Sequence, residues 1–223
     1  MDLTLYILKV TAIFTRNYIY ILSDNQTGET VILDPVWDRK GIEYILEKNK
    51  LILNAVLLTH HHPDHVHLAD ELAVSRECPV YMSGEEISFY NFSCHNLLPV
   101  EHAVPIHLKS ITITPLLTPG HTRGSMCFLI DNYLFTGDTL FTEGCGFCCG
   151  RGADPADMFR SLQLLKQQIP LQTKIYPSHS YGHEPGKFFS EVLKINIYLD
   201  FKNEEEFIKY RMRKNQKTIF AFK

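Results

Sequence analysis

The most constraining feature of this chain is a run of six residues, His60 to His65, with the sequence HHHPDH, directly after an apolar segment. That segment, residues 52–58, reads as a buried strand, and Pro63 prevents the strand from continuing through the run. Four imidazoles and one carboxylate therefore gather on a short loop. These ligands favour zinc or iron, because calcium and magnesium sites are built from oxygen ligands. A solvated loop accounts for one or two histidines, so this density predicts a metal site.

Other apolar segments end in the same kinds of residue. Three of them each lead into one candidate ligand: 111–117 into His121, 133–135 into Asp138, and 174–176 into His179. Alone, each residue would more often be a hydrogen-bonded histidine or a turn aspartate than a ligand. Together with the histidine-rich loop they predict a site built at one edge of a sheet, where strands hold loop residues in place.

Bulk properties set limits on the class of protein. The chain has 223 residues and 45% hydrophobic content, enough for one domain with an ample core and a small appendage. A net charge of -3 argues against a nucleic-acid scaffold. The N-terminus lacks a basic signal region and no apolar run reaches spanning length, so we expect a cytoplasmic protein.

The six cysteines are interpreted as free thiols rather than a disulfide framework, because the chain is large and has no secretion signal. Cys145, Cys148 and Cys149 lie close together in the sequence. A single Cys-x-x-Cys is weak evidence for metal or redox chemistry, and the histidines already account for a metal. We interpret these three as small loop residues, and the sequence assigns them no role.

The pattern of apolar residues predicts an α+β protein. Strands are expected at 4–10, 17–22, 30–34, 52–58, 79–82, 110–117, 125–131, 133–136 and 173–177. Helices are expected at 39–48, 67–76, 84–91, 155–168 and 185–199. This alternation fits two sheets packed face to face with helices outside, an αββα sandwich. We expect a catalytic domain at 1–200 and a short, helical, basic C-terminal extension at 201–223 packed on the same domain.

The spacing His60-x-His62-x-Asp64-His65, followed by His121, Asp138 and His179, resembles the metallo-β-lactamase superfamily. The resemblance implies the αββα sandwich and two metal ions. It implies that His60, His62 and His121 hold one ion, that Asp64, His65 and His179 hold the second, and that Asp138 bridges them. His61 is then no ligand. Asp34 resembles the acid that orients a ligand imidazole in this superfamily, although an ordinary Asp-Pro turn explains it equally well.

The implied chemistry is hydrolysis by two metals roughly 3.5–4 Å apart, with Asp64 and Asp138 as the carboxylates of the catalytic centre. Two zinc ions are expected, with iron or manganese as alternatives. Because Asp138 and His65 both provide ligands, the pattern departs from the β-lactamases proper. Antibiotic hydrolysis is therefore a minor option.

Within the superfamily, the sequence segments 17–20, 135–141 and 144–146 resemble those of glyoxalase II, a thioester hydrolase. Tyr181 matches a tyrosine on the substrate side of that family, and Arg211-x-x-Lys214 resembles its basic C-terminal pair. Glyoxalase II follows its Gly-Cys-Gly with a lysine and an aromatic residue that bind glutathione, whereas here Phe147 and two cysteines follow. The chain therefore lacks the glutathione-binding pair of that family at these positions.

A narrower resemblance covers residues 144–155, 176–182 and 210–216. These segments are similar to the zinc-dependent hydrolases encoded with bacterial trans-acyltransferase polyketide synthases, whose implied task is to cleave acyl thioesters from acyl carrier protein. We expect Phe147, Tyr181, Arg211 and Lys214 to contact such a substrate, without nucleic acid or membrane as a partner. Residues 207–223 hold six basic side chains and no acidic one, which suits an acidic carrier, although a solvated helix face is the plainer interpretation.

Three other functions remain open from the sequence. An iron-dependent persulfide dioxygenase would share the fold but use one metal. A phosphodiesterase or nuclease would normally carry extra domains or arms. A metal-stabilised binding module would tolerate closed coordination without a position for water.

Overall fold

The computed structural model describes residues 2–12 and 15–214, and its strands form two six-stranded sheets. The first sheet has the order β1-β2-β3-β4-β5-β6: β1 (Leu3–Ala12), β2 (Thr15–Asp24), β3 (Glu29–Leu33), β4 (Ile52–Leu57), β5 (Val80–Ser83) and β6 (Leu97–Val100). The second has the order β12-β11-β10-β9-β8-β7: β7 (Ile106–His107), β8 (Thr112–Leu117), β9 (Met126–Ile130), β10 (Tyr133–Gly137), β11 (Lys174–Pro177) and β12 (Lys187–Phe188).

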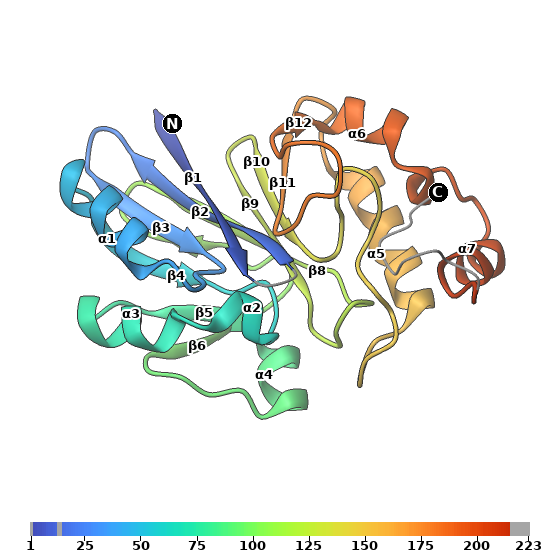
Figure 1. Ribbon diagram of the computed structural model, residues 1–223, viewed down its shortest axis with the longest axis horizontal. Helices are drawn as coiled ribbons and strands as arrows, with labels where there is room; N and C mark the ends of the chain where they lie inside the picture. The colour runs from blue at the N-terminus through green and yellow to red at the C-terminus, as the bar shows by residue number, and fades with distance from the viewer. Residues whose placement is uncertain (1, 13–14, 215–223) are drawn as a thin grey trace.

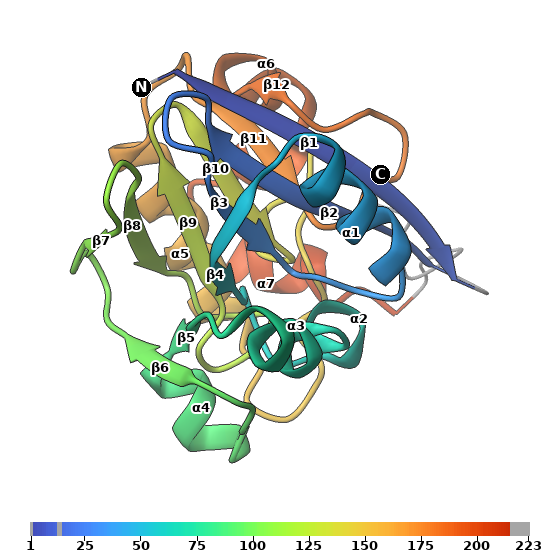
Figure 2. The ribbon, with the colours of Figure 1, turned by 90° about the vertical axis from the view of Figure 1, so that its left-hand side faces the viewer.

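Helices lie on the two outer faces of the paired sheets (Figure 1). They are α1 (Arg39–Lys48), α2 (Pro63–Val66), α3 (Ala69–Arg76), α4 (Gly84–Tyr90), α5 (Pro155–Gln168), α6 (Phe189–Ile195) and α7 (Glu204–Arg211), with a 3-10 turn at Ile197–Leu199. Helices α1 and α3 cover the first sheet, and α5 to α7 cover the second. Figure 2 shows the two sheets layered one behind the other. The predicted αββα sandwich is confirmed.

Local signals explain why the expected elements form. Asp38 caps α1 by accepting from the Gly41 amide, and Asp154 caps α5 by accepting from two amides behind Pro155. The nine expected strands and the first four expected helices match the structure within two residues at each end.

The expectation of one helix at 185–199 is wrong. Residues 187–188 instead pair with β11 as β12, and α6 and the 3-10 turn follow. The left-handed backbone of Gly186 and the pairing with β11 override the helical periodicity. The short elements α2, β6 and β7 were not expected, because Pro99 obscures β6 and two residues give β7 no detectable pattern.

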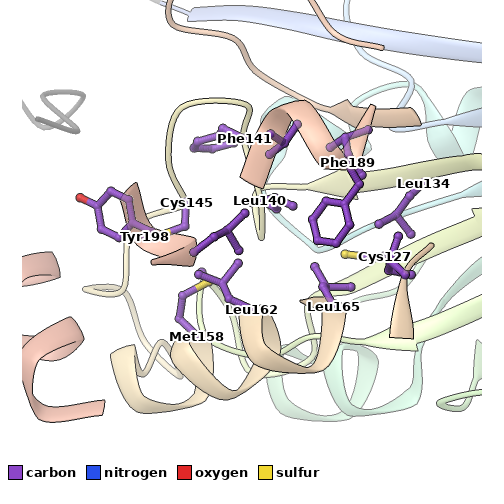
Figure 3. Packing of buried hydrophobic residues seen from close by; sticks show 14 of the residues in the cluster. Cys127, Leu134, Leu140, Phe141, Cys145, Met158, Leu162, Leu165, Phe189 and Tyr198 are labelled. Atoms are coloured by element: carbon purple, nitrogen blue, oxygen red, sulfur yellow. The ribbon is translucent and has the colours of Figure 1, made fainter. Parts of the chain in front are cut away.

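Three clusters of buried apolar side chains hold the layers together. One lies between the sheets, one lies between the first sheet and α1 and α3, and one lies between the second sheet and α5 to α7. Figure 3 shows the last cluster, in which Leu162 and Leu165 of α5 face Phe189 of α6. The apolar face of α5 is therefore core.

The C-terminal segment packs on the second layer. Phe207 of α7 is fully buried in the cluster under α5, and its ring lies 5.5 Å from that of Phe159. Residues 215–223, with Lys217 and Lys223, lie outside the described residues. A domain boundary at residue 200 stays a prediction.

No helix within residues 2–12 and 15–214 has both the length and the apolar character needed to cross a membrane. All six cysteines are free thiols, as the sequence predicts.

Candidate metal centre

The candidate ligands follow strand ends, on loops and, for Asp64 and His65, in the short helix α2. The histidine-rich loop follows β4, and Asp138 follows β10. Strands β3 and β4 run parallel, as do β10 and β11, so their carboxyl ends meet at one edge of the sandwich. The sequence-predicted ligands, far apart along the chain, come together there as three overlapping groups: His60, His62, His121; His60, His65, Asp138; and Asp64, His65, His179.

The first ligand set consists of His60, His62 and His121. His62 Nδ1 lies 3.0 Å from His60 Nε2 and 3.0 Å from His121 Nε2. In a tetrahedral zinc site with Zn–N bonds of about 2.0 Å, ligand nitrogens lie roughly 3.3 Å apart. The three nitrogens thus have the spacing expected of three ligands of one ion.

The second ligand set consists of Asp64, His65 and His179. His179 Nε2 lies 3.5 Å from Asp64 Oδ2, and His65 Nε2 lies 3.8 Å from Asp64 Oδ1. Asp138 lies between the two sets: its Oδ1 is 3.4 Å from His179 Nε2 and its Oδ2 is 3.5 Å from His121 Nε2. One carboxylate therefore faces both sets.

Hydrogen bonds on the outer side of the imidazoles fix their protonation. His65 Nδ1 donates to Asp34 Oδ2 at 2.9 Å, since a carboxylate only accepts. His121 Nδ1 donates to the Phe147 carbonyl and His179 Nδ1 to the Arg16 carbonyl, each at 2.8 Å. The Nε2 atoms of these three rings are left without a proton in the neutral form and can bind a metal.

Asp34 hydrogen-bonds the ring of a candidate ligand, His65, as an acid that orients a ligand imidazole would do. Its buried carboxylate also accepts from the amide and hydroxyl of Thr59 and from the Ser178 hydroxyl, at 2.7–2.8 Å. The Thr59 hydroxyl lies 3.0 Å from His60 Nδ1. Asp34 has a left-handed φ of 46°, so the backbone adopts an uncommon conformation to place this carboxylate.

The two sets differ in electrostatics. Burial, then the neighbouring imidazoles, lowers the pKa of His60 well below its usual range, and the same causes lower that of His62 to about 4. Burial would also lower the pKa of His65, but the carboxylates of Asp138, Asp34 and Asp64 outweigh it and raise the value to about 9.

Glu86 is a buried residue beside the candidate site that the sequence did not reveal. This fully buried carboxylate in α4 accepts from the backbone amide and Nδ1 of His61 through Oε1, at 2.9 and 2.6 Å. Through Oε2 it accepts from the Thr122 hydroxyl and the Gly124 amide, at 2.9 and 2.8 Å. Glu86 thus joins the loop of His60 and His62 to the loop of His121. In the sequence it is an ordinary acidic residue in the first turn of a helix, which gives no signal.

His61 belongs to this bracing contact and to none of the three ligand groups. Its ring stacks on that of Tyr90 at 3.7 Å.

The residues present fit metal ions. Among the residues that the structure describes, the buried His65 Nε2 and Asp138 Oδ1 have no hydrogen-bond partner. A buried polar atom left unpaired costs about 1–3 kcal/mol, and these two atoms lie 3.7 Å apart among the candidate ligands. The donor set of imidazoles and carboxylates suits zinc or iron.

The residues expected to contact the substrate differ in burial and in their distance from the candidate ligands. Tyr181 lies beside the second set, with its ring 6.4 Å from that of His179. Phe147 is half-buried, and its carbonyl accepts a hydrogen bond from His121 Nδ1. Lys214 is exposed.

Arg211, in contrast, is buried, although we expected it to meet a carrier at the surface. Its Nε donates to the Gly146 carbonyl at 2.9 Å, and its guanidinium lies 5.0 Å from the Phe147 ring centroid. The planar cation packs against an aromatic ring and hydrogen-bonds a carbonyl inside the protein, so it supports the loop after β10. The structure therefore does not bring Arg211 and Lys214 together as a surface pair.

Comparisons with known proteins agree with this geometry. Residues 13–179 match the metallo-β-lactamase superfamily. The chain is 44% identical to "Probable polyketide biosynthesis zinc-dependent hydrolase BaeB" of Bacillus velezensis, covering 93% of this chain and 92% of that protein. It is 42% identical to "Probable polyketide biosynthesis zinc-dependent hydrolase PksB" of Bacillus subtilis, covering 96% and 98%.

More distant relatives include hydroxyacylglutathione hydrolase of Shewanella loihica, 33% identical over 75% of this chain and 63% of that protein. Among solved structures, ETHE1 from Myxococcus xanthus superposes with a TM-score of 0.83 at 25% identity, covering 97% of this chain and 94% of that one. TTHA1623 in a di-iron-bound form superposes with a TM-score of 0.69 at 25% identity, covering 86% and 99%.

The chain belongs to the metallo-β-lactamase superfamily. With this metal-ligand geometry and relatives named as hydrolases, it is a metal-dependent hydrolase.

Proposed function

We propose that this chain is a dinuclear zinc hydrolase of acyl thioesters, acting on acyl groups bound to acyl carrier protein in polyketide biosynthesis. One observation carries the dinuclear part: Asp138 faces both ligand sets, with one oxygen 3.4 Å from His179 and the other 3.5 Å from His121. A carboxylate in that position suits a bridge between two ions. The di-iron form of TTHA1623 supports the same number of metals.

Two bound zinc ions would supply a water-derived nucleophile at neutral pH and stabilise negative charge on the substrate carbonyl oxygen. The chain's own residues hold the ligands in place. Asp34 and the Phe147 and Arg16 carbonyls fix three imidazoles with Nε2 directed inward, so little reorganisation is needed when ions and substrate bind.

The names of the relatives support the substrate class. BaeB and PksB are named as hydrolases of polyketide biosynthesis, and they cover nearly the whole chain. The loop after β10 supports it as well, because Phe147, Cys148 and Cys149 stand where glyoxalase II has its glutathione-binding pair. Cys148 is buried in the core and Phe147 is half-buried, so these two side chains give the charged groups of glutathione no partner, which favours an uncharged acyl chain or a pantetheine arm.

Hydroxyacylglutathione hydrolysis is the second candidate. Tyr181 lies beside His179, as expected from the resemblance to that family, and the Shewanella relative has that name. Persulfide dioxygenase and a non-enzymatic metal-binding module are less favoured, because neither needs a second complete ligand set.

A thioester panel tests the proposal. The zinc-loaded protein is assayed with matched acyl conjugates of glutathione, coenzyme A and acyl carrier protein, while metal content and oxygen uptake are recorded. We expect close to two ions per chain and the highest kcat/KM on the carrier conjugate. A higher kcat/KM on lactoylglutathione would favour the glyoxalase candidate, and oxygen uptake with a single iron would favour the dioxygenase.

A further inference from the structure

Arg151 is held in a fixed position on an aromatic surface beside the metal centre. Its guanidinium carbon lies 4.9 Å from the Phe89 ring centroid and 6.0 Å from that of Tyr90. Its Nη2 donates to the Phe89 carbonyl at 3.3 Å, and its own carbonyl accepts from the Tyr90 hydroxyl at 2.5 Å. We call Arg151, Phe89 and Tyr90 the arginine shelf.

Gly152 allows this close approach. Its φ is +77°, and a Cβ at this position would lie 2.5 Å from the Tyr90 hydroxyl oxygen and 2.6 Å from Phe89 Cε1. Only glycine fits, so the loop that follows β10 packs closely against α4 at this point.

Two contacts connect the arginine shelf to the candidate metal centre. The Tyr90 ring stacks on His61, whose neighbours in sequence are His60 and His62 of the first ligand set. The loop after β10 begins at the same centre, because the Phe147 carbonyl holds His121.

The charge of Arg151 is available to a ligand. Within residues 2–12 and 15–214, no carboxylate lies within ion-pair distance of its guanidinium, and its side chain is exposed. A second cation, Arg123, lies nearby: its amide donates to the Tyr90 hydroxyl, and its side chain is 54% exposed and only 4.0 Å from Glu85, a weak contact. A substrate that reaches this surface meets two arginines in a chain that is acidic as a whole.

The distance suits a phosphorylated pantetheine arm. Three residues lie between Phe147 and Arg151, so the Cα atoms of these two residues are at most about 14 Å apart. A pantetheine arm has a backbone comparable to about five extended residues and spans roughly 16 Å. With its thioester at the metals, such an arm can place its phosphate at the shelf, where the guanidinium can engage two phosphate oxygens.

We propose that the arginine shelf binds the phosphate of the phosphopantetheine arm and so selects carrier-bound thioesters. This inference rests on the proposed thioesterase function and adds the subsite that recognises the carrier.

The test compares two small substrates that differ in one group: an acyl 4′-phosphopantetheine and the same acyl pantetheine without phosphate. The proteins are the zinc-loaded wild type, Arg151→Gln, Arg151→Lys, and Arg160→Gln as the control. Arg160 is an exposed arginine on α5 that pairs with Asp157 and Glu204, so its change has the same charge effect away from the shelf.

For the wild type we expect a KM about tenfold lower for the phosphorylated substrate, with similar kcat. Arg151→Gln should remove this difference, Arg151→Lys should restore part of it, and Arg160→Gln should keep it. The inference is overturned if the wild type does not distinguish the substrates, or if Arg151→Gln raises both KM values equally.

An outcome that contradicts the proposed thioesterase function can be distinguished from one that contradicts the arginine shelf. If the wild type hydrolyses neither substrate, the proposed function is wrong, and titration calorimetry with 4′-phosphopantetheine and pantetheine then tests the shelf by binding alone. Equal affinity for the two thiols in that experiment would overturn the shelf as well.

Discussion

The two ligand sets of the metal centre are built from different chemistry. The first holds three imidazoles, and burial lowers the pKa of each, to about 4 for His62. The second contains the carboxylate of Asp64 beside two imidazoles. The carboxylates of Asp138, Asp34 and Asp64 raise the pKa of His65 to about 9. One half of the centre therefore presents neutral ligands, and the other surrounds its ligands with negative charge that would balance a divalent cation.

The braces of the two sets differ as well. Asp34 touches a ligand ring of the second set directly, through His65 Nδ1, and reaches the first set only through the Thr59 hydroxyl, which lies beside His60 Nδ1. Glu86 touches no ligand ring, and it reaches the first set only through His61, Thr122 and Gly124. A direct brace sets the tautomer and orientation of one ligand, whereas an indirect brace sets the distance between two loops. We therefore expect changes at Asp34 and Glu86 to weaken different ions by different amounts.

The largest effect should come from Asp138→Ala, because this residue faces both sets. We expect kcat/KM to fall roughly a thousandfold and the content of both ions to drop, since loss of the shared carboxylate weakens both sites. Metal analysis after dialysis and thioester kinetics measure this. His61→Ala, which alters a residue outside the ligand groups, should matter far less. Full activity with one tightly held ion in Asp138→Ala would contradict the shared bridge.

Asp34→Asn should come next, with an affinity for the second ion about 10–100-fold lower. The amide places a donor where the carboxylate accepts from Thr59, His65 and Ser178, so the tautomer of His65 is no longer fixed. Chelator competition should show one weakened and one nearly unchanged step. Equal weakening of both steps would mean that Asp34 supports the whole edge of the sandwich.

Glu86→Gln should weaken the first ion, by about tenfold, because an indirect brace acts only through the separation of two loops. The matched control is Glu85→Gln, a change of the adjacent residue, whose side chain is 60% exposed. The same chelator competition applies. A loss confined to the second ion would refute the assignment of Glu86 to the first set.

The smallest effect on the metals should come from Glu29→Gln, which changes a third buried carboxylate far from both sets. Glu29 accepts from the amides of Lys109, Ser110 and Ile111 and from the Ser110 hydroxyl, so we expect a loss of unfolding free energy of about 1–3 kcal/mol with metal affinity unchanged. Denaturant unfolding and chelator competition measure the two quantities.

The pH dependence of that loss follows from the pKa of Glu29. Burial would raise this pKa, but the hydrogen bonds from residues 109–111 outweigh it and lower the value. The carboxylate therefore stabilises the fold fully above its unfolded pKa of about 4.3, and this contribution is lost as pH falls through the lower folded pKa. The difference between wild type and Glu29→Gln should be constant near neutral pH and shrink in acid. A difference that grows in acid would refute this.

Much of the centre could be predicted from sequence because its signals are local. Four of the seven ligands lie within six consecutive residues, and Pro63 and the preceding apolar strand fix where that loop begins. The other three follow strands whose apolar runs are visible without any tertiary contact. The boundaries of α1 and α5 were equally local, since their capping aspartates lie beside them.

The sequence by itself thus determined the candidate ligand set, the layered fold and the superfamily, because periodicity, turn residues and the spacing of the candidate ligands act over a few residues. Only the tertiary structure decided that Glu86 braces the first set, that Arg211 lies inside the protein, and that Arg151 rests on Phe89 and Tyr90. Each of these partners is more than 20 residues away in sequence. The hydrogen-bond partner of a buried or loop side chain depends on which segments pack against it, and no local pattern records that.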